Sequence, residues 1–180
     1  MSKTAFIFPG QGAQTAGMGK DFYENSRTAK DIFDMASELL SLDMRKLCFE
    51  KNDLLDKTEY TQAALVTTCL AITKEVENLG IKPDVAAGLS LGEYAAIVAA
   101  HGMTEKEAIV AVRKRGIFMD EAVPTDNPKK AGAMAAVLGM ETSKIEELIL
   151  DIEDVDIANY NCPCLLYTSP SSRDGLLSRM

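Results

Sequence analysis

Residues 83–100 read PDVAAGLSLGEYAAIVAA, a short apolar run followed by a glycine-flanked serine. The first part, 83–88, predicts a short strand, and the part after Leu91 predicts a helix that continues to about Ala100. The chain therefore turns abruptly from strand to helix around Ser90, within the pattern G-x-S-x-G.

A turn of this kind lifts the serine hydroxyl into solvent and needs glycine wherever a Cβ would collide. Amides at the start of the following helix favour negative charge that develops beside the serine. A Gly/Ser turn that merely connects two elements would use the same residue types. The strand–turn–helix setting favours Ser90 as a nucleophile.

The rest of the first 122 residues predicts one α/β unit. Residues 4–8 predict a further strand, short and buried, that is closed by a turn at 9–12. Apolar residues recur at helical spacing in four further places, namely 27–40, a short segment around Met44, 62–79 and 105–122. Thr104 and Glu107 form a capping-box pattern before the last of these helices. Strands and helices in this order predict a parallel sheet.

The composition changes after residue 122. Residues 123–130 contain two prolines and predict a linker, after which a strand at 131–138, a helix at 143–150 and a strand at 155–161 predict a small α+β unit. The last stretch, CLLYTSPSSRDGLLSRM, shows no period, and we expect a disordered or foreign tail. The expected parts are an α/β core, an α+β unit and this tail, at residues 1–126, 127–163 and 164–180.

Two further polar residues can reach the crevice beside Ser90. Gln11 follows the first strand in FPGQG, and ligands of open α/β sheets bind outside the carboxyl ends of the strands. Arg115 lies at the edge of an apolar stripe on the predicted helix 105–122. An arginine that points inward needs a carboxylate partner, which a bound substrate can supply. The alternatives are an ordinary turn residue and a solvated basic helix face.

Charge and hydropathy exclude several classes of function. The chain has 19 Lys and Arg against 27 Asp and Glu among its 180 residues, a net charge of −8, which argues against nucleic-acid binding. No run approaches the roughly 18 apolar residues of a membrane helix. The apolar run at 5–10 is too short for a signal peptide, so we expect a cytoplasmic protein without a membrane partner.

The cysteines and the single histidine predict no metal site. Cys48 and Cys69 lie within helical patterns and are expected to be reduced core residues. Cys162 and Cys164 are too closely spaced for a zinc knuckle, and no second pair accompanies them. His101 stands just before a glycine at a predicted helix end, where a histidine can cap carbonyls.

Three separated motifs resemble the malonyl-CoA:acyl carrier protein transacylase family, which includes acyltransferase domains of fatty acid and polyketide synthases. The motifs are FPGQG at 8–12, GLSLGEY at 88–94 and RGIFM at 115–119, and NYNCP at 159–163 is also similar to a family segment. The resemblance implies an α/β-hydrolase-like parallel-sheet core with an inserted ferredoxin-like α+β subdomain, both expected to be incomplete in this chain.

The resemblance also implies a reaction of fatty acid biosynthesis. Malonyl passes from malonyl-CoA to the phosphopantetheine thiol of acyl carrier protein through a malonyl-serine intermediate. Ser90 would be the nucleophile, the amides of Gln11 and Leu91 would form the oxyanion hole, and Arg115 would pair with the malonyl carboxylate. We expect malonyl-CoA and acyl carrier protein as the partners of a monomeric enzyme that uses no cofactor and no metal.

Two departures from the family pattern bear on activity. Leu89 stands where the family often has a histidine that is not the general base. The family's catalytic histidine lies well downstream of the nucleophile, nothing after Pro163 resembles that region, and His101 occupies a different place. Because an unassisted serine is a weak nucleophile, we expect the parent protein to be active and this chain alone to be inactive.

Two other functions remain open. A serine esterase of the α/β-hydrolase class shares G-x-S-x-G but would give Arg115 no task, and p-nitrophenyl ester turnover would identify it. A non-catalytic relative would bind acyl-CoA or a partner without turnover, and CoA binding without an acyl-enzyme would identify that function.

Overall fold

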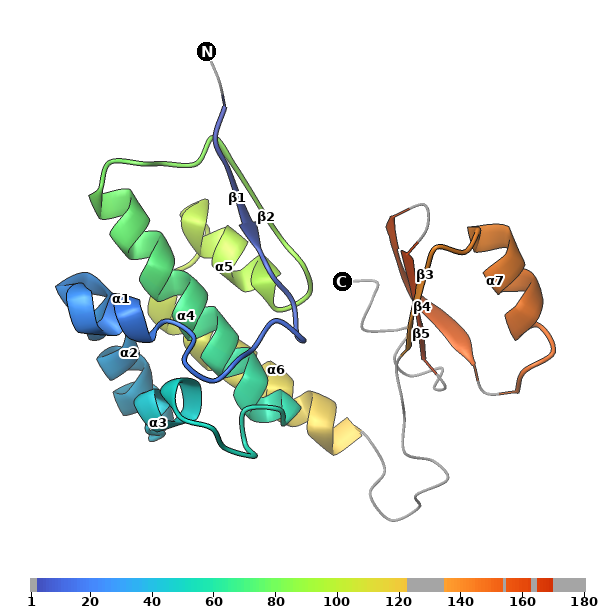
Figure 1. The fold of residues 1–180 in the computed structure, drawn as a ribbon, viewed down its shortest axis with the longest axis horizontal. Coiled ribbons are helices and arrows are strands. Elements are labelled where there is room, and N and C mark those ends of the chain that lie inside the picture. Colours follow the sequence, from blue (N-terminus) through green and yellow to red (C-terminus); the bar gives the residue numbers. More distant parts are fainter. Residues whose placement is uncertain (1–2, 123–134, 154, 163–164, 170–180) are drawn as a thin grey trace. The chain divides into compact units, whose positions relative to one another are not determined.

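The structure is a computed structural model that describes residues 3–122, 135–153, 155–162 and 165–169 (Figure 1). The chain divides into two compact units, Met1–Ala122 and Val123–Met180, and each is described by itself. The predicted linker at 123–130, which contains the expected boundary at 126, lies outside the described residues.

The first unit is an α/β structure. Its elements in chain order are β1 (Ala5–Phe8), α1 (Lys20–Asn25), α2 (Arg27–Leu40), α3 (Met44–Phe49), α4 (Thr58–Asn78), β2 (Val85–Gly88), α5 (Gly92–Ala99) and α6 (Glu105–Ala122). Both predicted strands and all the predicted helices of this part are present. The expectation that the strand at 4–8 is buried is wrong, because alternate residues face opposite sides of the strand and Ile7, on the outer side, is 71% exposed. The short helix α1, which buries none of its residues, was not predicted, and α4 begins at Thr58 rather than at residue 62.

β1 and β2 form a parallel pair, as the order of elements predicts. Ala5 lies opposite Val85, and Phe8 lies opposite Gly88. The Leu89 amide donates to the carbonyl of Phe8 at 3.0 Å, so the pairing continues one residue past β2. The loops that follow the two strands therefore lie at the same edge of the sheet. α5 packs against both strands (Figure 1).

α4 is the central helix of this unit and packs against α1, α2, α3, α5 and α6. The sequence predicts a single apolar stripe from Leu65 to Leu79. Instead, every residue from Thr61 to Thr68 is buried, and Leu79 is 72% exposed. The prediction of one buried face is wrong because helices cover this part of α4 on all sides.

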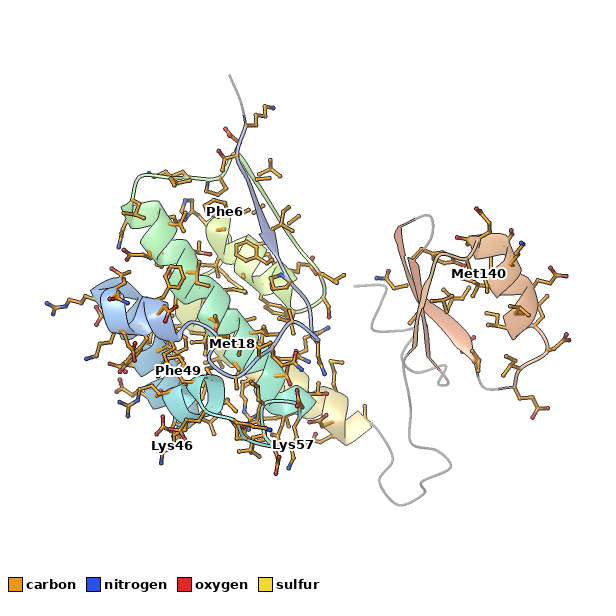
Figure 2. The ribbon with its side chains drawn as sticks, viewed as in Figure 1. Phe6, Met18, Lys46, Phe49, Lys57 and Met140 are labelled. Atoms are coloured by element: carbon orange, nitrogen blue, oxygen red, sulfur yellow. The ribbon has the colours of Figure 1, made fainter. Side chains whose placement is uncertain are left out.

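Local side-chain contacts set the ends and the packing of the surrounding helices. The Ser26 hydroxyl accepts from the Ala29 amide at 3.1 Å and caps α2. The predicted capping box is present, with the Thr104 amide donating to the Glu107 carboxylate at 2.8 Å and the Glu107 amide donating back to the Thr104 hydroxyl at 3.3 Å. Phe49, labelled in Figure 2, packs against the rings of Tyr23 and Phe33 at centroid distances of 5.4 and 5.1 Å.

The second unit contains an antiparallel sheet and one helix in its described part. Its elements are β3 (Ala135–Leu138), α7 (Thr142–Ile149), β4 (Asp156–Cys162) and β5 (Leu165–Ser169), with the sheet order β3-β5-β4. This β-α-β-β sequence matches the first four of the six elements of the ferredoxin-like arrangement.

The structure differs from the expected tail in this second unit. Residues 165–169 pair with both β3 and β4, so the expectation of disorder is wrong for them. They read LLYTS, which gives no clear period in isolation, and only pairing on both sides makes them a central strand. Residues 164 and 170–180 of the expected tail lie outside the described residues.

Among the described residues, no helix has the length and apolar character needed to cross a membrane.

The turn between β2 and α5 has no room for side chains at its two glycines. A Cβ on Gly88 would lie 2.1 Å from the backbone of Gly92, and a Cβ on Gly92 would lie 2.5 Å from the carbonyl oxygen of Pro9. These are backbone contacts, which cannot move without separating the helix from the strands. Glycine at both positions is therefore a condition of the close approach of β1, β2 and α5.

Replacing Gly92 with alanine should destabilise the fold by about 3 kcal/mol, because the new methyl group overlaps the backbone after β1. Urea denaturation followed by far-UV circular dichroism measures this loss. Gly80→Ala is the matched control, since Gly80 has a φ of 85° and no atom within 4 Å of the added Cβ. That variant should lose about 1 kcal/mol, the cost of the left-handed backbone alone. Equal losses in the two variants would contradict the packing argument.

Candidate active site

Ser90 occupies a strained backbone position at the tip of the turn. Its φ is 54°, in the left-handed region that residues other than glycine rarely adopt. The turn is closed by the Gly92 amide, which donates to the Leu89 carbonyl at 2.9 Å, and by the Glu93 amide, which donates to the Ser90 carbonyl at 3.2 Å. The Ser90 side chain is exposed. The structure thus presents this hydroxyl at the amino end of α5, as the sequence predicts.

The loop after β1 lies against this turn. A Cβ on Gly10 would be 3.0 Å from the Leu89 carbonyl oxygen, so the two backbones are in contact. The side chain of Gln11 is directed elsewhere, because its Nε2 donates to the Thr58 hydroxyl at 3.3 Å at the start of α4. Its contribution to the site can therefore come from the backbone.

Two backbone amides near Ser90 are available to an oxygen anion. Within the described residues, neither the Gln11 amide nor the Leu91 amide donates a hydrogen bond. Leu91 precedes the first residue of α5, where helix amides carry partial positive charge. Leu91 follows Ser90 directly, and Gln11 follows Gly10, whose backbone lies against this turn. Their role as oxyanion-hole donors remains a prediction.

Arg115 contacts Ser90 directly. Its Nη2 donates to Ser90 Oγ at 3.0 Å, and its Nη1 donates to the Oε1 of Gln62 at 2.6 Å. Arg115 is partly buried, so it does not lie on a fully solvated basic face, which was the alternative for this residue. Desolvation lowers the pKa of the guanidinium, and the nearby Tyr94 and Glu93 raise it by less. An arginine keeps its proton under these conditions, so the group remains a cation.

Both hydrogen-bond partners of Arg115 are uncharged. Within the described residues, no carboxylate forms an ion pair with this guanidinium. A partly buried cation without a counter-charge is costly, and the cost falls when a carboxylate forms two parallel hydrogen bonds with it. The site can therefore hold an acyl group that carries a free carboxylate beside Ser90.

Gln62 belongs to this site, and the sequence did not predict it. The predicted helix begins at residue 62, which put Gln62 at an exposed helix end. In the structure α4 begins one turn earlier, and Gln62 is fully buried. The signal was present in its neighbours, because an amide followed by Ala63, Ala64 and Leu65 is a polar group inside an apolar stretch and needs a partner.

α4 and α6 are held in register by a clamp near Arg115, formed by Glu59, Tyr60, Arg113 and Asp120. Arg113 donates through Nη2 to the Glu59 carboxylate at 2.9 Å and through Nη1 to the Glu59 carbonyl at 2.7 Å. Its guanidinium also lies 4.4 Å from the ring centre of Tyr60. The Glu59 amide donates to Asp120 at 3.1 Å. Gly116 faces Glu59 so closely that a Cβ would lie 2.7 Å from the Glu59 Cα.

The single histidine is remote from Ser90. His101 follows α5, whose eight residues span about 12 Å, and has a φ of 59° at the helix end. Within the described residues, the only side chain that hydrogen-bonds the Ser90 hydroxyl is Arg115. The interpretation of His101 as a residue at a helix end agrees with this position. Leu89, next to the nucleophile, is 43% exposed.

No metal-binding cluster is present in the described part of the chain, since no three His, Cys, Asp or Glu side chains gather there. Cys48 and Cys69 are both free thiols, as the sequence predicts. Burial raises the pKa of Cys48 to about 12 and that of Cys69 to about 11, so neither forms a reactive thiolate near neutral pH. Cys162 and Cys164 have no described side chains.

An exposed serine at a strained strand-to-helix turn, beside amides that donate to no other described residue, is the arrangement of α/β enzymes that form acyl-serine intermediates. A family model described as the acyl transferase domain matches residues 5–172. The chain belongs to this family.

The relatives agree with this membership. The malonyl CoA-acyl carrier protein transacylase of Bacillus subtilis is 44% identical over 178 residues, which cover 96% of this chain and 55% of the relative. The crystal structure of the Clostridium perfringens malonyl CoA-acyl carrier protein transacylase matches with a TM-score of 0.84 at 40% identity, over 99% of this chain and 56% of that one. The chain thus spans about half the length of the relatives that it matches.

A third similar structure contains a partner. It is a malonyl-transacylase in complex with a type II PKS acyl-carrier protein, 32% identical to this chain with a TM-score of 0.83. The alignment covers 98% of this chain and 58% of that transacylase.

Removing the clamp should destabilise the first unit. Arg113→Ala loses a hydrogen bond, an ion pair and the contact with Tyr60, so we expect a loss of about 2 kcal/mol in the free energy of unfolding. Lys114→Ala is the matched control, because Lys114 is an exposed cation on the same helix. It should change stability by less than about 0.5 kcal/mol. Urea denaturation of both variants tests this, and similar values would show that the clamp contributes nothing.

Proposed function

We propose that this chain supplies the nucleophile and the acyl-binding residues of a malonyl-CoA:acyl carrier protein transacylase of fatty acid biosynthesis. The observation that carries the proposal is the contact between the Arg115 cation and the Ser90 hydroxyl, with no carboxylate paired to Arg115 among the described residues. A reactive hydroxyl next to an uncompensated cation suits an acyl group that has a carboxylate one carbon away from its carbonyl.

The free carboxylate of malonyl would draw Arg115 into a paired interaction. A charge-assisted hydrogen bond contributes about 1.5–3 kcal/mol, so this pairing is enough to favour malonyl over acetyl by roughly 10- to 100-fold. The serine hydroxyl would be released from Arg115 in the same movement. Binding of the correct acyl group therefore also frees the nucleophile.

The chemistry consists of two transfers at one serine. Ser90 Oγ attacks the thioester carbonyl of malonyl-CoA, an O–C bond forms, the C–S bond breaks, and the CoA thiol takes the proton that the hydroxyl loses. The amides of Gln11 and Leu91 would stabilise the oxyanion, a kind of interaction worth roughly 10²–10³-fold in rate per donor. The phosphopantetheine thiol of the carrier protein then attacks the carbonyl of malonyl-serine, a C–S bond forms, the ester C–O bond to Ser90 breaks, and the thiol proton passes to Ser90 Oγ.

The partners follow from the same proposal. The Bacillus subtilis relative is named for malonyl-CoA and acyl carrier protein, and the complex with an acyl-carrier protein supports a carrier-protein partner for this chain. We expect no cofactor, because both half-reactions use only the serine and the two thiols. A monomer in the cytoplasm, where the substrates of fatty acid synthesis occur, is part of the proposal.

A second candidate function is binding without turnover. Its support is that, among the described residues, the Ser90 hydroxyl has no general base beside it and forms a hydrogen bond only with the side chain of Arg115. A serine without a base is a poor nucleophile, so the 180-residue chain would bind malonyl-CoA and acylate slowly or not at all. The two candidates differ in whether an acyl-enzyme forms.

Incubation of the chain with malonyl-CoA and analysis by intact-protein mass spectrometry distinguishes them. We expect a malonyl adduct that forms slowly, accelerates when imidazole is added as an external base, and is absent in Ser90→Ala. Arg115→Ala should lower malonyl adduct formation by at least about tenfold and leave acetyl adduct formation from acetyl-CoA nearly unchanged. CoA thioester binding with no adduct under any of these conditions would favour the binding function.

Esterase activity is the contrasting outcome. Hydrolysis of a p-nitrophenyl ester that is faster than acylation by malonyl-CoA and insensitive to Arg115→Ala would contradict the transacylase proposal, because an esterase has no use for the cation.

A further inference from the structure

The side chain of Gln62 is a fully buried amide whose two polar atoms have different partners. It lies on the second turn of α4, with no exposed surface. Its Oε1 accepts from Arg115 Nη1 at 2.6 Å, and its Nε2 donates to the Sδ of Met119 at 3.1 Å. Arg115 and Met119 lie one helical turn apart on α6, so the amide spans two positions of the facing helix.

These partners fix the orientation of the amide. An arginine can only donate hydrogen bonds, and a thioether sulfur can only accept them. Rotating the amide by 180° would turn its NH₂ toward the guanidinium and its oxygen toward the sulfur, which would lose both interactions. Only one orientation of the Gln62 amide therefore satisfies both partners, and in it the oxygen faces Arg115.

The contact directs the guanidinium toward Ser90. With Nη1 held by Gln62, Nη2 reaches the Ser90 hydroxyl at 3.0 Å. The clamp of Glu59 with Arg113 and Asp120 lies one turn earlier on α4 and keeps Gln62 opposite Arg115. The position of the cation is thus determined by α4, although the cation belongs to α6.

The neutrality of Gln62 matters as much as its position. A glutamate of the same shape would pair with Arg115 and compensate its charge inside the protein. The amide anchors the guanidinium by one hydrogen bond and leaves its positive charge available to another anion.

We propose that Gln62 is a positioning residue that sets the preference for carboxylated acyl groups, because it anchors Arg115 beside Ser90 without neutralising it. The inference rests on the proposed function and adds a specificity-determining residue to it. The inference predicts that Gln62→Glu abolishes the discrimination between malonyl and acetyl groups. The fold and the binding of the CoA portion should persist in this variant.

The test compares the binding of malonyl-CoA and acetyl-CoA to the full 180-residue chain by isothermal titration calorimetry. The wild-type chain should bind malonyl-CoA at least about tenfold more tightly than acetyl-CoA. In Gln62→Glu the ratio of the two affinities, malonyl-CoA to acetyl-CoA, should fall to about one. We expect weaker binding of malonyl-CoA and unchanged binding of acetyl-CoA. Arg115→Ala should give the same ratio, since both variants remove the available charge.

Asn78→Asp is the matched control. It makes the same amide-to-carboxylate change on the same helix, at an exposed position about 24 Å along α4 from Gln62, where its Nδ2 donates to the Thr28 hydroxyl. Its malonyl-to-acetyl ratio should equal that of the wild-type chain. An equal fall in the ratio for Asn78→Asp and Gln62→Glu would mean that net charge is responsible, and would overturn the inference.

A second substitution covers the case in which the buried glutamate unfolds the chain. Gln62→Met keeps the length of the side chain, removes the acceptor and adds no charge, so the ratio should fall by at least about threefold. Far-UV circular dichroism verifies that each variant is folded. If folded Gln62→Met or Gln62→Glu keeps the wild-type preference for malonyl-CoA over acetyl-CoA, the inference about Gln62 is overturned and the proposed function is not. Equal binding of the two thioesters by the wild-type chain overturns the proposed function, and the inference with it.

Discussion

The close contact of three backbone segments at the end of the sheet is the constraint on which the rest of the first unit depends. The turn after β2, the loop after β1 and the first turn of α5 approach so closely that neither Gly88 nor Gly92 has room for a Cβ. This approach forces Ser90 into a left-handed backbone and exposes its hydroxyl at a helix amino terminus. It also places the backbone of Gly10, and with it the amide of Gln11, against the same turn. Nucleophile and candidate oxyanion donors therefore result from a single packing condition.

A second layer of structure brings the cation to this turn. α4 and α6 are long helices that cross the unit side by side, and their register is set by the ion pair and hydrogen bonds of Glu59 with Arg113 and Asp120. Within that register the neutral amide of Gln62 faces Arg115, and Arg115 faces Ser90. The site thus joins a rigid backbone feature of the sheet to a side-chain network between two helices. Chemistry at Ser90 and selection by Arg115 depend on different parts of the fold.

Much of this arrangement was predictable from local patterns. The strand–turn–helix around Ser90, the parallel pair and the capping box of Thr104 and Glu107 follow from glycine spacing, helical periodicity and the order of elements, all of which are local signals. Gln62 was missed because a helix boundary that is wrong by one turn placed it at the end of the predicted helix, although the apolar residues that follow it along the chain are a local signal of burial. The strand at Leu165–Ser169 was missed for a different reason, since a central strand derives its stability from two neighbours rather than from its own pattern.

The sequence by itself determined the class of fold, the nucleophile turn and the three motifs that relate the chain to acyltransferases, because each depends on residues close together along the chain. Only the tertiary structure decided which atoms meet. Arg115 lies 25 residues from Ser90 and 53 residues from Gln62 along the sequence, yet it contacts both. Both contacts depend on the register of packed helices. That register is set by side-chain packing and by buried hydrogen bonds, which no local pattern of residues specifies.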